Sequence, residues 1–108
     1  MQTDTAIKEF SSLFGEQRVK STLRKMADIE ISHCRLDLKN AGEALRPFKK
    51  RFGMTSRQAW ERYNNGLLGD DLDIMKWMGL YENYLALKQQ LKQIKDSPTY
   101  AELRCSTH

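Results

Sequence analysis

The sequence contains few of the residues that build β-sheets, disulfide frameworks or membrane spans. Val19 is the only valine among 108 residues, and such scarcity of β-branched side chains disfavours a sheet. Two cysteines, Cys34 and Cys105, are too few for a disulfide framework. No apolar run approaches the roughly 18 residues of a membrane span, and no segment has the pattern of a signal peptide. We therefore expect a reduced, cytoplasmic protein that has no membrane contact.

Patterns that carry catalysis or bind metals are equally scarce. Asp70, Asp71 and Asp73 form the one carboxylate cluster, but their spacing does not match a calcium loop. We interpret them as helix-capping residues, and the alternative is a metal-dependent enzyme. His33 and Cys34 are adjacent, so on a helix they point about 100° apart and cannot bind one ion. The sequence predicts no enzyme, no metal site and no cofactor.

The dominant signal is a heptad seam in the first half of the chain. Apolar residues recur at alternating spacings of four and three from Ala27 to Phe52, which predicts a long helix over residues 16–50 that packs lengthwise on another helix. Ile29-Glu30-Ile31 alternates as a strand does, but the seam covers far more residues. Because Ile29 and Leu36 lie off the seam, we expect a second apolar face. The seam residues are Ala27, Ile31, Cys34, Leu38, Ala41, Leu45, Phe48 and Phe52.

Two further features shape this long helix and its partner. Pro47 lacks an amide proton, so we expect a kink or break near it. A second long helix is predicted over residues 71–95, with Asp70 or Asp71 as its cap and its own heptad seam. The second seam consists of Trp77, Leu80, Tyr84, Leu87, Leu91 and Ile94, and Ile74, Met78, Tyr81 and Leu85 form a parallel stripe.

Three short elements complete the prediction. Residues 3–14 form a short helix with an apolar stripe of Ile7, Phe10, Leu13 and Phe14. Residues 55–65 form another, because Thr55 and Gln58 fit a capping box and Gly66 supplies a left-handed cap. Residues 96–108 form a short turn and a tail, with Ser97 as cap and Pro98 at the first helical position.

The fold class is therefore predicted to be all-α, with one domain over residues 1–108. Two long helices form an antiparallel hairpin through coiled-coil-like heptad seams, and short accessory helices lie beside it. The first seam is longer than one partner helix covers. For that reason we expect a homodimer, in which two hairpins form a four-helix bundle.

The net charge of +4 is concentrated in the middle of the sequence. Residues 35–62 hold eight bases against three acids. The bases are densest at Arg46, Lys49, Lys50 and Arg51, a cluster that suits phosphates or an acidic protein. The same bases also complement the dipole at the end of a helix.

Aromatic and arginine side chains alternate in the predicted short helix. Trp60 and Tyr63 share one face, and Arg57 and Arg62 flank them. Aromatic residues and arginine together are typical anchors of protein interfaces. We expect Trp60, with these two arginines, to be exposed and to bind a protein partner, although helically spaced aromatic residues also build cores.

The segment from Phe52 to Glu82 resembles a set of small prokaryotic proteins. The resemblance rests on Phe52-Gly53-Met54-Thr55-Ser56-Arg57, Trp60, Tyr63, Asn65-Gly66-Leu67-Leu68-Gly69-Asp70-Asp71, Trp77 and Leu80-Tyr81-Glu82. Some of these proteins are treated as antitoxin-like partners of small toxins. The resemblance implies a partner-binding protein and no catalytic role.

The predicted function is therefore a non-enzymatic protein-interaction module, the antitoxin-like partner in a prokaryotic pair of the toxin–antitoxin type. In this hypothesis Arg57, Trp60, Arg62 and Tyr63 bind the partner, and a toxin is the candidate for it. The alternative is a helical protein that binds nucleic acid through the basic stretch 46–62.

Overall fold

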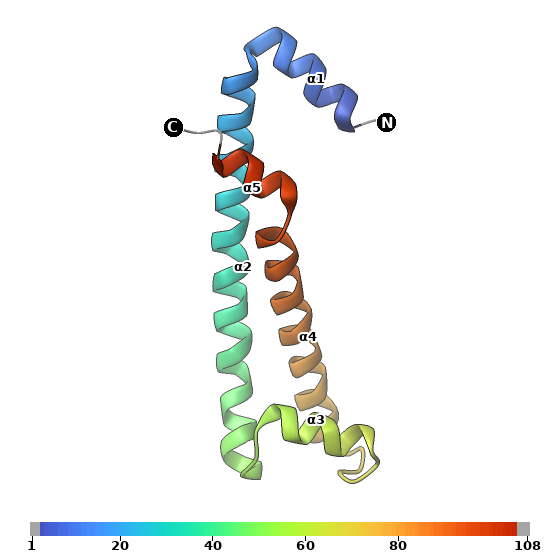
Figure 1. Ribbon diagram of the computed structural model, residues 1–108. Coiled ribbons are helices and arrows are strands. Elements are labelled where there is room, and N and C mark those ends of the chain that lie inside the picture. The colour runs from blue at the N-terminus through green and yellow to red at the C-terminus, as the bar shows by residue number, and fades with distance from the viewer. Residues whose placement is uncertain (1–2, 106–108) are drawn as a thin grey trace. The chain divides into compact units, whose positions relative to one another are not determined.

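A computed structural model describes residues 3–105, and it is all-α (Figure 1). No strand occurs in this range, so the strand-like alternation around Ile29 lies within a helix. The five helices are α1 (Thr3–Phe14), α2 (Glu16–Phe52), α3 (Ser56–Asn64), α4 (Leu72–Lys95) and α5 (Pro98–Cys105).

The chain divides into two compact units of contacts. Unit 1 comprises Met1–His33 and Leu91–His108, and unit 2 comprises Cys34–Gln90. No linker separates the units, because α2 and α4 each begin in one unit and end in the other.

Unit 2 contains an antiparallel, hairpin-like pair made from the second half of α2 and most of α4. An ideal Cβ on Gly42 would lie 3.5 Å from the ring of Tyr84. Further along α2, Phe52 stacks on Trp77, and Arg51 pairs with Asp73. The contacts on α4 move toward lower residue numbers as those on α2 move toward higher ones, which confirms the antiparallel hairpin predicted from the two seams.

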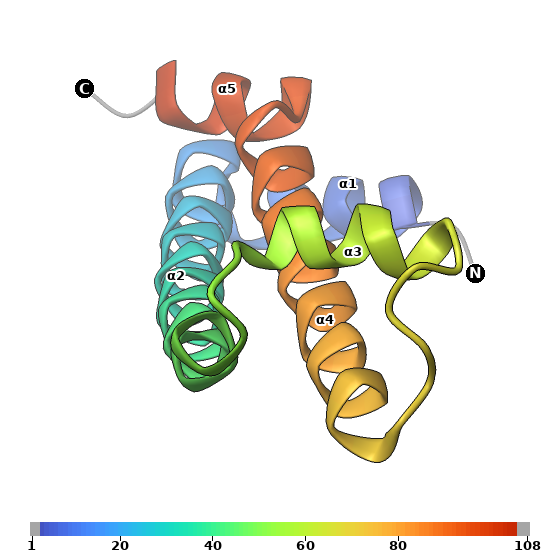
Figure 2. The same ribbon diagram turned by 90° about the horizontal axis from the view of Figure 1, so that it is seen from below.

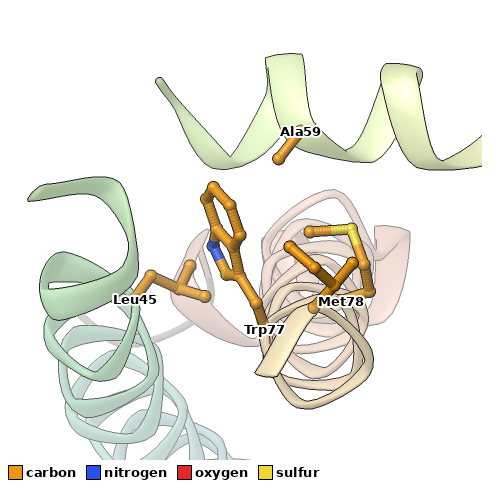
Figure 3. Packing of buried hydrophobic residues seen from close by; sticks show 5 residues of the cluster. Leu45, Ala59, Trp77 and Met78 are labelled. Carbon is orange, nitrogen blue, oxygen red and sulfur yellow. The ribbon is translucent and has the colours of Figure 1, made fainter. Parts of the chain in front are cut away.

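Trp77 is the centre of the unit 2 core (Figure 3). Its side chain is 0% exposed, and its ring stacks within 13° of Phe52 and 12° of Phe48, at centroid distances of 5.2 and 5.9 Å. The indole N–H donates a 3.0 Å hydrogen bond to the buried hydroxyl of Ser56. One side chain of α4 therefore contacts the end of α2 and the start of α3. The buried cluster is Leu45, Ala59, Ile74, Trp77 and Met78.

Helix α3 lies across α4 within unit 2 (Figure 2). It begins as the sequence predicted. The Thr55 hydroxyl accepts from the Gln58 amide at 3.1 Å, and the Gln58 side chain accepts from the Thr55 amide at 3.0 Å.

The end of α3 is a Schellman motif, which confirms the predicted left-handed cap. Gly66 has φ 73°. Its amide donates to the carbonyl of Tyr63 at 3.1 Å, and the Leu67 amide donates to the carbonyl of Arg62 at 2.8 Å. The positive φ explains why glycine stands here, since a Cβ makes this conformation unfavourable.

The two long helices differ slightly from their predicted limits. Helix α2 continues through Pro47 and ends at Phe52, two residues beyond the predicted end, so the proline produces no break in the helix. Helix α4 begins at Leu72, and Asp71 is its cap because the carboxylate accepts from the Ile74 amide at 2.9 Å.

Off the seam, the second apolar face of α2 is exposed to solvent. Ile29 and Leu36 are 55% and 56% exposed. By contrast, every residue of the first seam is buried or half-buried. The face exists as predicted from spacing, but no described part of the chain covers it.

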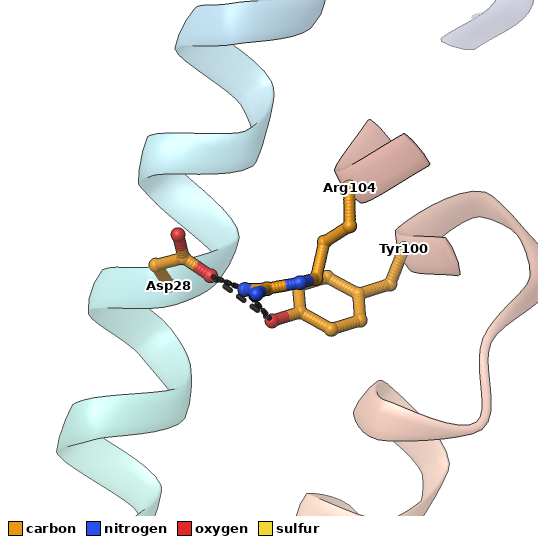
Figure 4. A network of polar contacts seen from close by, with 3 residues as sticks. All are labelled: Asp28, Tyr100 and Arg104. Atoms are coloured by element: carbon orange, nitrogen blue, oxygen red, sulfur yellow. Dashed lines mark hydrogen bonds and ion pairs between the residues drawn. The ribbon is translucent and has the colours of Figure 1, made fainter. Parts of the chain in front are cut away.

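In unit 1, α5 is held against α2 by a polar cluster (Figure 4). The Tyr100 hydroxyl donates to the Asp28 carboxylate at 3.0 Å, and the Arg104 guanidinium lies 3.5 Å from the same oxygen. Arg104 also donates to the Tyr100 hydroxyl, and this bond, together with the nearby charges, raises the pKa of Arg104 above its ordinary value. The sequence predicted a short helical turn here with Ser97 as cap and Pro98 at the first helical position, and α5 begins at Pro98 and extends over eight residues.

Replacing Trp77 tests the central role of this side chain. We expect Trp77→Ala to lower the free energy of unfolding by about 3–5 kcal/mol, because it leaves a cavity in the core. Leu72→Ala is the control, since Leu72 is 81% exposed, and its effect should stay within about 0.5 kcal/mol. Urea denaturation followed by circular dichroism measures both. Equal effects of the two substitutions would contradict the assignment.

Candidate partner-binding site

The predicted site on α3 divides between two faces of the helix. Ser56 and Ala59 are buried against the core. Trp60 and Tyr63 are half-buried and pack on the same cluster. The aromatic pair therefore belongs to the inner face of α3 and supports the hairpin.

The expectation that Trp60 is exposed is wrong. Its ring lies 5.8 Å from that of Tyr81 on α4, at a tilt of 60°. Tyr81 in turn stacks on Tyr84 at 6.2 Å. Apolar side chains at helical spacing pack against the nearest apolar helix, and the stripe of α4 supplies it. The rim of the Trp60 side chain remains accessible.

Arg57 and Arg62 lie on the solvent side of α3, but they do not form one surface with each other. Their separation of five residues places them about 140° apart around the helix. Arg57 pairs with Glu61 at 3.5 Å, and Arg62 contacts the sulfur of Met54 at 3.9 Å. The four residues predicted to bind a partner are thus neighbours on one short helix that face different directions.

The four bases at the end of α2 also differ in their surroundings, because one forms an ion pair and three are exposed without one among the described residues. Arg51 forms a 2.7 Å ion pair with Asp73, and its guanidinium lies 5.1 Å from the centre of the Phe52 ring. Arg46, Lys49 and Lys50 are exposed, and none of them has an ion-pair partner within residues 3–105. At about 100° per residue these three lie within roughly 100° of arc, on one face of α2.

This face carries two further bases that the sequence reasoning missed. Arg35 and Lys39 are exposed on the same helix. With Arg46 and Lys50 they are spaced by 4, 7 and 4 residues, which places all four in one row along α2. Over 15 residues the row extends about 22 Å. Helical spacing alone would have found it, because the bases repeat with the heptad period of the seam. We call Arg35, Lys39, Arg46, Lys49 and Lys50 the basic stripe.

An open depression lies where α2 ends and α3 begins. It has a volume of about 330 Å³ and is lined by Lys49, Gly53, Met54, Thr55 and Gln58. Gly53 has φ 66°, which allows the sharp exit from α2. The depression connects one base of the stripe with the first turn of α3.

Two of the three carboxylates near the start of α4 have structural roles. Asp71 caps the helix and Asp73 pairs with Arg51. Within the described residues, no group of three or more histidine, cysteine or acidic side chains is arranged to hold a metal ion. Cys34 is a buried free thiol, as its place in the seam predicted. Among the same residues, no helix is both long and apolar enough to cross a membrane.

Comparisons with protein-family models, with curated proteins and with solved structures found no match to this chain. The resemblance of the segment from Phe52 to Glu82 to antitoxin-like proteins therefore stays a prediction. The proposed function therefore rests on the geometry of the basic stripe and of α3.

Trp60 and Arg57 should respond differently to truncation. We expect Trp60→Ala to lower the free energy of unfolding by about 2 kcal/mol, because it removes a half-buried ring from the Tyr81 contact. Arg57→Ala should change stability by less than about 0.5 kcal/mol, since its ion pair is exposed. Thermal and urea denaturation provide the readout. A neutral Trp60→Ala variant would contradict the inner-face assignment.

Proposed function

We propose that the protein is a non-enzymatic interaction module whose unit 2 binds an acidic protein partner. The observation that carries this proposal is the basic stripe: five exposed bases on one face of α2 with no ion-pair partner among the described residues. An excess of one charge sign on a surface attracts a partner of opposite sign and accelerates its association.

The close packing of the unit 2 core supports the proposal. Helix α3 and the end of α2, which carries Arg46, Lys49 and Lys50, pack on the cluster around Trp77, with its stacked rings and its hydrogen bond to Ser56. A surface fixed in this way binds with little loss of conformational entropy, which favours affinity. The depression beside Lys49 gives an approaching side chain a place to pack.

An acidic protein fits the stripe better than a nucleic acid does. Binding of single strands commonly uses aromatic rings as stacking platforms, but Trp60 and Tyr63 pack on the core. Two carboxylates also lie close to the bases. Glu43 is three residues before Arg46 on the same helical face, and Glu61 pairs with Arg57. A protein partner can place a base opposite each acid, whereas a phosphate backbone cannot.

The resemblance to antitoxin-like proteins suggests the biological setting. In that setting the partner is a small toxin encoded with this chain, and binding blocks the toxin. The stripe then supplies the charge complementarity, and Arg57 and Arg62 extend the contact onto α3.

Charge reversal tests this proposal. We expect Arg46→Glu combined with Lys50→Glu to weaken binding of a copurifying acidic partner at least tenfold, as reversal of opposed charges typically costs more than about 1.4 kcal/mol. The matched control is Lys76→Glu combined with Lys88→Glu. This control makes the same charge change on exposed positions of α4 in the same unit. Affinity is measured by titration calorimetry with the purified partner.

Equal loss of binding in both double variants would indicate a general charge effect and contradict the stripe. A partner that binds both variants as tightly as the natural chain would contradict it as well. Circular dichroism should show unchanged helix content in all variants, since every substituted side chain is exposed.

Nucleic acid is the second candidate partner, and the length of the stripe favours it. If all five bases contact phosphates, the logarithm of the binding constant should fall with the logarithm of salt concentration with a slope of about −4. Fluorescence anisotropy with labelled single-stranded and duplex oligonucleotides measures this slope. Absence of binding at low salt would eliminate this candidate, and binding that Arg46→Glu and Lys50→Glu abolish would favour it over a protein partner.

A further inference from the structure

The apolar stripe of α1 lies on the surface of unit 1 instead of in a core. Ile7, Phe10, Leu13 and Phe14 were predicted to form one face, and all four are among the exposed large side chains of the protein. Leu13 is 65% exposed, Phe14 59% and Phe10 51%. A strongly amphipathic helix with an uncovered apolar face is unusual in an isolated chain.

This stripe forms one wall of a groove between α1 and the start of α2. The groove has a volume of about 660 Å³. Gly15 connects its two walls, and its φ of 93° turns the chain sharply between the helices. The apolar lining consists mainly of Ile7, Phe10 and Phe14 from α1 and Val19, Leu23 and Met26 from α2.

We infer that this groove is the homodimer interface, and that a second copy of the chain covers it with its own α1. The same face of both copies then meets across a two-fold axis, as in most homodimers. This inference concerns unit 1 and does not depend on the function proposed for unit 2.

The exposed area is of the size that a dimer needs. Six large apolar side chains of unit 1 are exposed on or beside the groove, and together they present on the order of 600 Å². A standard interface buries about 800 Å² on each partner, and the polar rim supplies the difference. The six are Ile7, Phe10, Leu13, Phe14, Met26 and Ile29.

The apolar surface continues beyond the groove, which favours a protein over a small ligand. Leu13 and Ile29 do not line the groove, but each lies three residues from a side chain that does. A small molecule in the groove would leave both exposed. The groove also offers few polar contacts, since Arg18 and Thr22 are the two polar residues of its lining and Thr22 already donates to the carbonyl of Arg18 at 3.0 Å.

The charge of unit 1 favours a second copy over a membrane or a highly charged partner. Residues 1–33 and 91–108 carry eight bases and seven acids, so two copies repel each other little. Membrane-surface helices carry lysine and arginine on their polar face, whereas the exposed charges described on α1 are Lys8 and Glu9.

Sedimentation equilibrium of the full chain tests the inference. We expect a reversible dimer, and Leu13→Glu should raise its dissociation constant at least about tenfold by placing an unpaired carboxylate in an apolar interface. Leu72→Glu is the matched control, since it makes the same change at a leucine that is 81% exposed in unit 2. This control should dimerise as the natural chain does. Circular dichroism verifies that both variants fold.

Isotope-filtered NMR on a mixture of labelled and unlabelled chains locates the interface. Contacts between the rings of Phe10 and Phe14 of one copy and α1 or α2 of the other are expected. A chain that remains monomeric up to about 1 mM, beyond most specific associations, would overturn the inference. A dimer that Leu13→Glu leaves intact would overturn it too. Binding of the monomer to neutral phosphatidylcholine vesicles, lost in Leu13→Glu, would assign the face to lipid instead.

Discussion

The geometry of unit 2 depends on the contacts that Trp77 of α4 makes with two other helices. The indole lies on α4, its faces stack near Phe48 and Phe52 on α2, and its N–H is bonded to Ser56 at the start of α3. Burying a tryptophan requires a partner for this N–H, because an unpaired buried donor costs about 1–3 kcal/mol. Ser56 is this partner. The capping box at Thr55 fixes where α3 begins and so positions Ser56.

This contact explains why α3 crosses the hairpin where it does. With Ser56 tied to Trp77 and Ala59 fully buried, the first turn of α3 lies directly on the core. The small side chain of Ala59 allows the helix to approach closely. Trp60 then reaches Tyr81, and the outer face of α3 is left to arginine. The outward orientation of Arg57 and Arg62 on α3 is thus a consequence of how one tryptophan is buried.

Local signals were enough to predict most of the secondary structure. The capping box at Thr55, the left-handed Gly66 and the cap Asp71 act over three or four residues, so a short window of sequence contains all of their causes. The heptad seams predicted the pairing of α2 with α4 because their apolar period matches lengthwise helix packing. The sequence predicted a kink or break near Pro47. Helix α2 is not broken there, because a helix held by a seam tolerates the loss of one hydrogen bond.

The candidate site was harder to predict because it depends on which face each helix presents. The sequence of a short amphipathic helix does not show whether an aromatic residue faces a partner or the core. Trp60 faces the core because it packs on Tyr81, which lies 21 residues away in sequence. Arg35 and Lys39 were overlooked for a different reason. They are isolated in sequence, and only the helical period brings them into one row with Arg46.

The two exposed surfaces differ in their physical character. The basic stripe acts through charge, so added salt should weaken its interactions, with screening over about 10 Å at 0.1 M. The groove beside Phe10 and Phe14 acts through apolar burial, which salt does not screen and which strongly excluded salts strengthen. The two proposals together assign self-association to the groove of unit 1 and partner binding to the stripe of unit 2. Opposite responses to ionic strength would then distinguish the two surfaces in a single protein.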